Sequence, residues 1–178
     1  MNSFYSEEEL SQLGLKCYGM DVKISRFARI YGAEQITIGD NVRIDDFCIL
    51  SGHITLGSNI HISAYVALYG SKGIVLEDFT GISPQTTIYS VMDDFSGDYL
   101  SGPSHDESKT NVTGGPVIIK RFSQIGTKCC VFPNLTIGEG VAVGACSLVT
   151  KSLKEWGIYI GTPVRYLKPR SKKIKNLV

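Results

Sequence analysis

The sequence lacks the features that mark membrane, nucleic-acid-binding and zinc-binding proteins. No apolar run approaches the roughly 18 residues that a membrane-spanning helix needs, so we expect no stable membrane insertion. The 178 residues carry 18 basic and 17 acidic side chains, a balance that predicts no nucleic-acid partner. The 5 cysteines match no zinc-site spacing, and the acidic stretch at residues 6–10 does not resemble a signal peptide. We therefore expect a cytoplasmic protein.

The dominant pattern in the sequence is a six-residue repeat of aliphatic side chains. The main row is Ile38, Ile44, Leu50, Leu56, Ile62 and Leu68, and a second row two positions earlier is Ile36, Val42, Cys48, Ile54, Ile60 and Val66. A helix repeats apolar residues about every 3.6 positions, and a strand alternates them for only a few residues. A sustained period of six predicts an all-β fold, a parallel β-helix whose successive coils stack both rows into one core.

The repeat is interrupted and then resumes. It shifts by two positions near residues 32–33 and 69–72, disappears over 91–115, and returns from 116 to 149. Glycine often follows the main row, where either a positive φ or close stacking of backbones would favour it. Because three hexads make one triangular coil, the sequence predicts roughly five to six coils.

These segments predict a single domain for residues 1–178. We expect a helical cap at 3–14, coils at 20–90 and 116–150, an inserted loop at 91–115, and a C-terminal extension at 151–178. Ser6 followed by Glu9 is a typical helix start, and Gly14 is a typical stop. Such a helix would cover the open edge of the first coil. A long loop without repeats inside a repeat array is usually functional.

The hexads, the inserted loop and the C-terminal motifs resemble those of the hexapeptide-repeat acetyltransferases. The motifs are Ser-Leu-Val-Thr-Lys at 147–151 and Gly-Thr-Pro-Val-Arg at 161–165. The resemblance covers about residues 20–170 and is greatest to galactoside, maltose and xenobiotic O-acetyltransferases and to acetyltransferases of surface-polysaccharide sugars. It implies a left-handed β-helix, a homotrimer, acetyl-CoA bound between neighbouring subunits, and a sugar or sugar-nucleotide acceptor in bacterial polysaccharide biosynthesis.

The same resemblance implies which residues contact acetyl-CoA. The pantetheine arm would follow the C-terminal coils near Gly126, Gly144 and Ala145. The nucleotide end would meet a second group, which consists of Thr150, Lys151, Pro163, Arg165 and Arg170. Lysine and arginine are both suitable partners for phosphate. The glycines also have a purely structural explanation as hexad corners, so Lys151 and Arg165 are the better candidates.

The sequence departs from the resembled family at the catalytic base. That family places a histidine near the start of the inserted loop, where this chain has Asp93 or, in a second alignment, Met92. The candidate bases are therefore Asp93, its neighbour Asp94, and the loop histidine His105, whose ordinary pKa suits proton transfer near neutral pH. If the acceptor is an amine, less basic assistance is needed, and the loss of the histidine is tolerable.

Two other functions are compatible with the same fold. A zinc carbonic anhydrase needs three histidines that converge on one metal, but His53 and His61 are eight positions apart, out of register with a six-residue repeat. We therefore expect no metal. The second alternative is a non-catalytic scaffold or trimerisation module. The missing histidine favours a scaffold, whereas Lys151 and the Gly-Thr-Pro-Val-Arg motif favour an enzyme.

Overall fold

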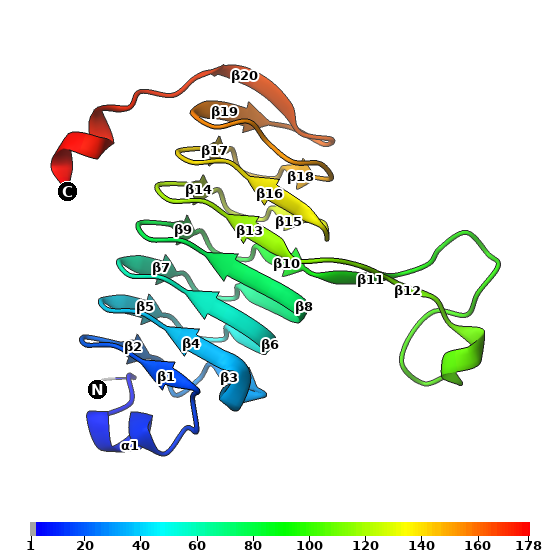
Figure 1. The fold of residues 1–178 in the computed structure, drawn as a ribbon, viewed down its shortest axis with the longest axis horizontal. Helices are drawn as coiled ribbons and strands as arrows, with labels where there is room; N and C mark the ends of the chain where they lie inside the picture. The colour runs from blue at the N-terminus through cyan, green and yellow to red at the C-terminus, as the bar shows by residue number, and fades with distance from the viewer. Residues whose placement is uncertain (1–2) are drawn as a thin grey trace.

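The computed structural model describes residues 3–178 and is a parallel β-solenoid of about seven turns (Figure 1). The predicted β-helical fold class is confirmed. The helix α1 (Glu7–Ser11) lies at one end of the stack, and the strand β20 (Arg165–Pro169) lies at the other. None of the helices within residues 3–178 is long and apolar enough to cross a membrane.

Two sheets form the walls of the solenoid. The first is 8-stranded, and every strand in it except β20 runs parallel to its neighbours. It contains β2 (Lys23–Ile24), β5 (Val42–Ile44), β7 (Ile60–Ile62), β9 (Gly81–Ile82), β14 (Gln124–Ile125), β17 (Ala142–Val143), β19 (Gly157–Ile160) and β20. The second is 10-stranded and contains β1 (Cys17–Tyr18), β3 (Arg29–Tyr31), β4 (Ile36–Ile38), β6 (Ile49–Leu56), β8 (Ala67–Leu76), β10 (Thr87–Tyr89), β13 (Val117–Ile119), β15 (Cys130–Val131), β16 (Leu135–Ile137) and β18 (Leu148–Val149).

Both hexad rows face the interior, as the period of six predicted. Leu50 pairs with Leu68 in the next rung, and Ile36 pairs with Ile54. All four side chains are fully buried. Some polar members of the inward row pair with backbone: the Ser123 hydroxyl donates to the Gly138 carbonyl at 2.8 Å. The buried Thr80 hydroxyl has no hydrogen-bond partner within residues 3–178. A continuous aliphatic core is the main source of stability in a stack of this kind.

The glycines that follow the main row are needed because successive rungs stack closely, and none of them has a positive φ. A Cβ on Gly39 would lie 2.7 Å from the carbonyl carbon of Gly57, which is closer than real Cβ atoms come. Positive φ occurs elsewhere in the corners, including at Asn41 (φ 52°) and Phe47 (φ 61°). The corners therefore need glycine where successive backbones nearly touch.

The rungs extend beyond the predicted coil boundaries at both ends. β1 and β19 add rungs outside residues 20–150, which is why the turns outnumber the five to six predicted. Both escaped prediction because they depart from the aliphatic hexad: β1 is exposed Cys-Tyr, and β19 is Gly-Ile-Tyr-Ile.

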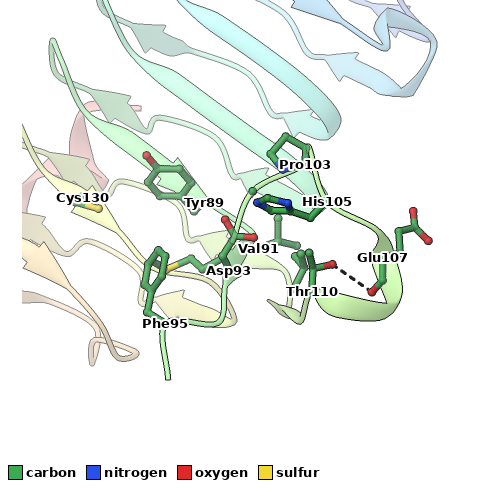
Figure 2. Close-up of a pocket in the computed structure, with 12 residues that line it drawn as sticks. Tyr89, Val91, Asp93, Phe95, Pro103, His105, Glu107, Thr110 and Cys130 are labelled. Atoms are coloured by element: carbon green, nitrogen blue, oxygen red, sulfur yellow. Dashed lines mark hydrogen bonds between the residues drawn. The ribbon is translucent and has the colours of Figure 1, made fainter. Parts of the chain in front are cut away.

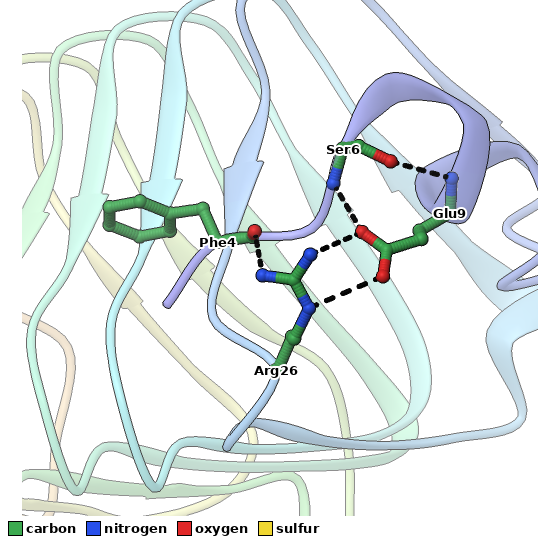
Figure 3. A network of polar contacts seen from close by, with 4 residues as sticks. All are labelled: Phe4, Ser6, Glu9 and Arg26. Atoms are coloured by element: carbon green, nitrogen blue, oxygen red, sulfur yellow. Dashed lines mark hydrogen bonds and ion pairs between the residues drawn. The ribbon is translucent and has the colours of Figure 1, made fainter. Parts of the chain in front are cut away.

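The N-terminal cap is shorter than the predicted range of 3–14. The helix covers only Glu7–Ser11, and Ser6 and Glu9 form a reciprocal capping box at its start. Figure 3 shows how Glu9 also pairs with Arg26, whose guanidinium donates to the Phe4 carbonyl. These contacts fasten the cap to the first rungs.

The inserted loop forms an arm that projects from the solenoid (Figure 1). Its base is an antiparallel hairpin of β11 (Val91–Asp93) and β12 (Val112–Gly114), and the 3-10 helix η2 (Glu107–Lys109) lies in its outer part. Below the insertion Ile74 of β8 pairs directly with Val117 of β13. The stack therefore continues past the arm without losing register.

The C-terminal extension folds back along the solenoid (Figure 1). β20 pairs antiparallel with β19, and the chain then returns towards earlier rungs, ending in the 3-10 helix η3 (Lys173–Leu177). Lys175 forms an ion pair with Glu139 at 2.7 Å and lies over the ring of Trp156. A third 3-10 helix, η1 (Ala33–Gln35), connects β3 to β4.

Candidate active site

A cavity of about 680 Å³ lies where the arm joins the solenoid (Figure 2). The solenoid contributes Tyr89 and Cys130 to its wall, and the arm contributes Asp93, Phe95 and His105 among others. Most of the lining is apolar, with a few titratable groups directed inward, which is the usual composition of a binding site for a small molecule.

Asp93 is the carboxylate that the hairpin presents to this cavity. It is the last residue of β11, and its partner across the hairpin is Val112. His105 reaches the same cavity from the outer loop of the arm, beside Pro103 (Figure 2). The structure thus brings together two of the three residues considered as catalytic bases.

Asp94 is placed differently and has structural partners. Its carboxylate accepts hydrogen bonds from the Ser96 backbone at 2.7 Å and from the Asn111 amide at 2.8 Å. These interactions, those from Ser96 foremost, lower the pKa of Asp94. Because a carboxylate with a lowered pKa accepts a proton poorly, Asp94 is the weaker candidate base and instead ties the two sides of the arm together.

Tyr89, which lines the solenoid side of the cavity, stacks on Tyr69. The rings of Tyr69 and Tyr89 lie 5.4 Å apart, with 14° between their planes. Burial raises the pKa of Tyr89, and the neighbouring Cys130 and Tyr69 raise it further. Its phenol therefore stays protonated and available as a hydrogen-bond donor over the physiological pH range.

The predicted pantetheine residues lie on a corner of the solenoid. Gly126 and Gly144 occupy equivalent positions in successive rungs, and their N–H groups donate to the carbonyls of Val143 and Tyr159, both at 2.8 Å. Ala145 follows and is exposed. These glycines have a structural role, since they allow successive rungs to approach closely.

Ser83 lies on the same corner, one rung below Gly126, and the sequence analysis missed it. Its backbone N–H donates to the Ile125 carbonyl at 2.9 Å. Its half-exposed hydroxyl makes no hydrogen bond with any residue in the range 3–178. A serine at a hexad corner is common, so nothing in the sequence distinguished it from the structural ones.

The residues predicted at the nucleotide end of acetyl-CoA separate into two groups. Lys151 and Arg165 are exposed and line one cavity of about 590 Å³ at the C-terminal end of the solenoid. Thr150 is exposed beside Lys151, and Pro163, which follows a cis peptide bond, is exposed near Arg165. The two cations are thus available to an anion.

Arg170 belongs to the other group because its guanidinium already has partners. Nη1 donates to the carbonyls of Phe122, Gly140 and Val141 at 2.8, 3.2 and 3.2 Å. Burial lowers the pKa of the guanidinium. In this arrangement Arg170 fastens the C-terminal extension to the solenoid.

The three histidines lie on separate parts of the chain. His53 is exposed on β6, His105 lies on the arm, and His61 of β7 places its Nε2 2.7 Å from the Asp45 carboxylate. Residues 3–178 contain no group of three or more His, Cys, Asp or Glu side chains placed to hold a metal ion. A three-histidine zinc centre therefore has no ligand set here.

Comparison with known proteins identifies relatives along almost the whole chain. A scan against protein-family models found no match. The dTDP-4-amino-4,6-dideoxy-D-glucose acyltransferase of Escherichia coli is 36% identical over 178 residues, which cover 98% of this chain and 93% of that protein. The galactoside O-acetyltransferase of E. coli K12 is 23% identical over 144 residues, covering 79% and 66% of the two chains.

A solved structure is similar along the same length. AntD, an N-acyltransferase from Bacillus cereus crystallised with dTDP and 3-hydroxybutyryl-CoA, superposes with a TM-score of 0.98. It is 53% identical, and the match covers 99% of this chain and 95% of AntD. A serine variant of AntD was crystallised with dTDP-4-amino-4,6-dideoxyglucose and coenzyme A. This chain therefore belongs to the hexapeptide-repeat family of sugar acyltransferases.

Proposed function

We propose that the protein transfers an acyl group from acyl-CoA to the 4-amino group of a dTDP-4-amino-4,6-dideoxyhexose. The observation that carries this proposal is Asp93, which stands in the cavity where the resembled O-acetyltransferases have a histidine. A neutral amine is a stronger nucleophile than a hydroxyl, so it needs less help from a base. The names of the E. coli and B. cereus relatives point to the same amino sugar.

Asp93 has two tasks in this reaction. As a carboxylate it accepts a hydrogen bond from the acceptor amine and orients the nitrogen lone pair towards the thioester carbonyl. When the carbon–nitrogen bond forms, the nitrogen becomes positively charged, and Asp93 takes up the proton that it loses. The carbon–sulfur bond then breaks, and Asp93 returns this proton to the departing thiolate of coenzyme A. The products are an amide and free coenzyme A, so atoms and charge balance.

Ser83 is the proposed donor to the carbonyl oxygen of the thioester. The crystallised AntD variants change a serine and an aspartate that are ten positions apart in AntD, and Ser83 and Asp93 are also ten apart here. A hydroxyl that has no other partner can stabilise the negative charge that develops on that oxygen. Loss of one such donor typically lowers the rate by about 10²–10³-fold.

The proposed active assembly is a homotrimer whose sites lie between subunits. Ser83 precedes β10 at one corner of the solenoid, and Asp93 lies beyond the other end of β10 in the arm. The side chains that follow one another up the face between them are those of Ile49, Ala67, Thr87, Cys130 and Leu148. Four of these five are apolar, although Ala67 is largely buried, and such a row suits contact with another copy. The arm of one subunit would then bring its Asp93 to the Ser83 of the next.

Mixing two inactive variants tests this arrangement. Ser83→Ala and Asp93→Asn homotrimers should each lose most of their activity, since every site lacks one residue. Trimers refolded from an equal mixture contain interfaces in which both native residues meet, and we expect partial recovery of turnover. Light scattering should give a trimeric mass for all samples. A trimer without recovered activity would contradict the shared site, and a monomer would contradict the assembly.

For the donor, we propose that acyl-CoA lies along the corner from Gly126 and Gly144 past Ala145. Its nucleotide end would reach the cavity of Lys151 and Arg165, with Thr150 and Pro163 beside it. The exposed Lys151 and Arg165 and the exposed Ala145 support this placement. A pure scaffold has no use for such a surface, so binding of coenzyme A separates the enzyme from the scaffold alternative.

The decisive experiment measures release of coenzyme A from acetyl-CoA with dTDP-4-amino-4,6-dideoxyglucose as the acceptor. We expect turnover with the amine and little with dTDP-glucose, which offers only hydroxyls. Asp93→Asn should lower kcat by about 10²-fold or more, because it keeps the shape and removes the base. His105→Asn is the comparison variant and should retain most of kcat. Turnover with dTDP-glucose alone would contradict the proposal.

A further inference from the structure

The surroundings of Asp93 in the cavity are apolar on several sides. On β11, Val91 lies two positions before Asp93, so these two side chains point to the same side of the strand. Phe95, beyond the end of β11, also lines the cavity. Val112 faces Asp93 across the hairpin, and Tyr89 closes the side of the solenoid. Polar side chains of the lining, such as that of His105, come from the outer part of the arm (Figure 2).

This arrangement constrains what the acceptor can carry next to its amine. In a 4-amino-hexose, C6 is attached to the carbon that neighbours the one bearing the amine. When Asp93 holds the amine, the C6 substituent must therefore lie beside Asp93. A methyl group there meets apolar side chains, whereas a hydroxymethyl group would leave its hydroxyl without a hydrogen-bond partner.

We propose that Val91 and Val112, with the ring of Tyr89, form a subsite for the C6 methyl group and select 6-deoxy amino sugars over their 6-hydroxy analogues. This inference rests on the proposed function and adds the residues that determine its acceptor specificity. An apolar pocket discriminates against an added hydroxyl by about 10²-fold. We expect the native enzyme to show a preference of that order in kcat/KM.

The two valines permit a test that barely changes the shape of the subsite. Threonine has nearly the volume of valine but carries a hydroxyl that can pair with a C6 hydroxyl. The acceptors are dTDP-4-amino-4,6-dideoxyglucose and dTDP-4-amino-4-deoxyglucose, each assayed with acetyl-CoA. Val91→Thr and Val112→Thr, alone and together, should reduce the preference for the deoxy sugar by about fivefold or more while the KM for acetyl-CoA stays unchanged.

Val75→Thr is the matched control. Val75 lies on the outer face of β8, away from the arm, and like Val91 it is half-exposed. It should leave both the preference and the KM values as in the native enzyme. Tyr89→Leu provides a second route to the same result, since it keeps the site apolar and should preserve the preference while it raises the acceptor KM.

Two outcomes would overturn the inference while the proposed function stands. One is native turnover that is equal for the two amino sugars. The other is a valine variant that changes selection between acetyl-CoA and 3-hydroxybutyryl-CoA but not between the acceptors, which would assign the apolar residues to the acyl chain. Failure of the native enzyme to acylate either amino sugar would instead reject the proposed function itself.

Discussion

Gly126 and Ala145 approach so closely that no side chain fits between them. A Cβ on Gly126 would lie 2.7 Å from the Ala145 backbone nitrogen and 2.7 Å from the Val143 carbonyl oxygen. One rung higher, a Cβ on Gly144 would instead meet the Cγ2 methyl of the Ile160 side chain, at 2.6 Å. Backbone atoms in a stacked rung cannot move aside, whereas an exposed isoleucine can change its rotamer.

Substitution of these two glycines by alanine should therefore have unequal effects. Gly126→Ala should lower the free energy of unfolding by about 1–3 kcal/mol, as overpacking against a fixed structure does. Gly144→Ala should cost less than about 1 kcal/mol, because only Ile160 must adjust. Urea denaturation of both variants would check this, and equal losses would show that the Gly126 corner is more compliant than its contacts indicate.

Truncation of Arg170 should destabilise the fold more than truncation of Arg165. Arg170→Ala leaves the Phe122, Gly140 and Val141 carbonyls without their donor and releases the C-terminal extension, so we expect a loss of about 2 kcal/mol. Arg165→Ala removes an exposed side chain and should change stability by less than about 0.5 kcal/mol. Thermal unfolding would distinguish them. A stable Arg170→Ala protein with weakened coenzyme A binding would restore Arg170 as a ligand contact.

Acid should weaken the fold partly through Asp45. Burial alone would raise the pKa of this carboxyl, but hydrogen bonds from Arg43 and His61 at 2.7 Å outweigh burial and lower it. A carboxyl whose pKa is lowered in the folded state stabilises the fold at pH values above its ordinary pKa, which is near 4. This contribution is lost as the pH falls through the folded-state pKa. Asp45→Asn should therefore be less stable than the native chain at pH 7, and the difference should shrink as the pH falls below the ordinary pKa of a carboxyl group.

That pH dependence can be measured by urea denaturation at a series of pH values. Because the group is partly exposed, the contribution should be modest and should weaken in high salt. Asp98→Asn, on the exposed tip of the arm, is the comparison variant and should follow the native curve. If the stability difference between the native chain and Asp45→Asn stays constant with pH, Asp45 contributes through shape and not through charge.

Removal of the cations at the C-terminal cavity should weaken donor binding selectively. In calorimetry, Lys151→Ala combined with Arg165→Ala should raise the Kd for acetyl-CoA by about 10–100-fold, since an exposed cation contributes about 1 kcal/mol to binding of an anion. Affinity for the dTDP sugar should not change. Lys72→Ala, an exposed lysine on β8, is the control. Unchanged acetyl-CoA binding in the double variant would place the nucleotide end elsewhere.

The aliphatic hexads made the fold predictable because the same geometric demand recurs in every rung. Ile44 and Ile62, for example, pair in successive rungs and face the same interior, so both positions indicate the same inward row. The first and last rungs were missed because end positions have a neighbour on one side only and tolerate other residues, such as Cys17 and Tyr159. There the aliphatic pattern is weakest although the backbone ladder continues.

The site was less predictable, because its residues differ from structural ones only in their three-dimensional contacts. The sequence singles out Asp93 only because this residue stands where a histidine is expected. Asp94 could serve as a base and Arg170 as a phosphate ligand by residue type. Only the structure shows that Asp94 is hydrogen-bonded to Asn111 and Arg170 to the Phe122 carbonyl. Ser83 looked like any other corner serine until its hydroxyl proved to have no partner within residues 3–178.

The pairing of Ile74 with Val117 has a consequence for how such proteins diversify. Because the stack closes over the place where the arm leaves, residues 91–114 behave as a cassette that is attached to the solenoid at one corner. Evolution can lengthen, shorten or recompose that cassette while the hexads continue to fold. Under the proposed function, exchange of the arm gives a new acceptor and leaves the rungs proposed to bind the donor unchanged.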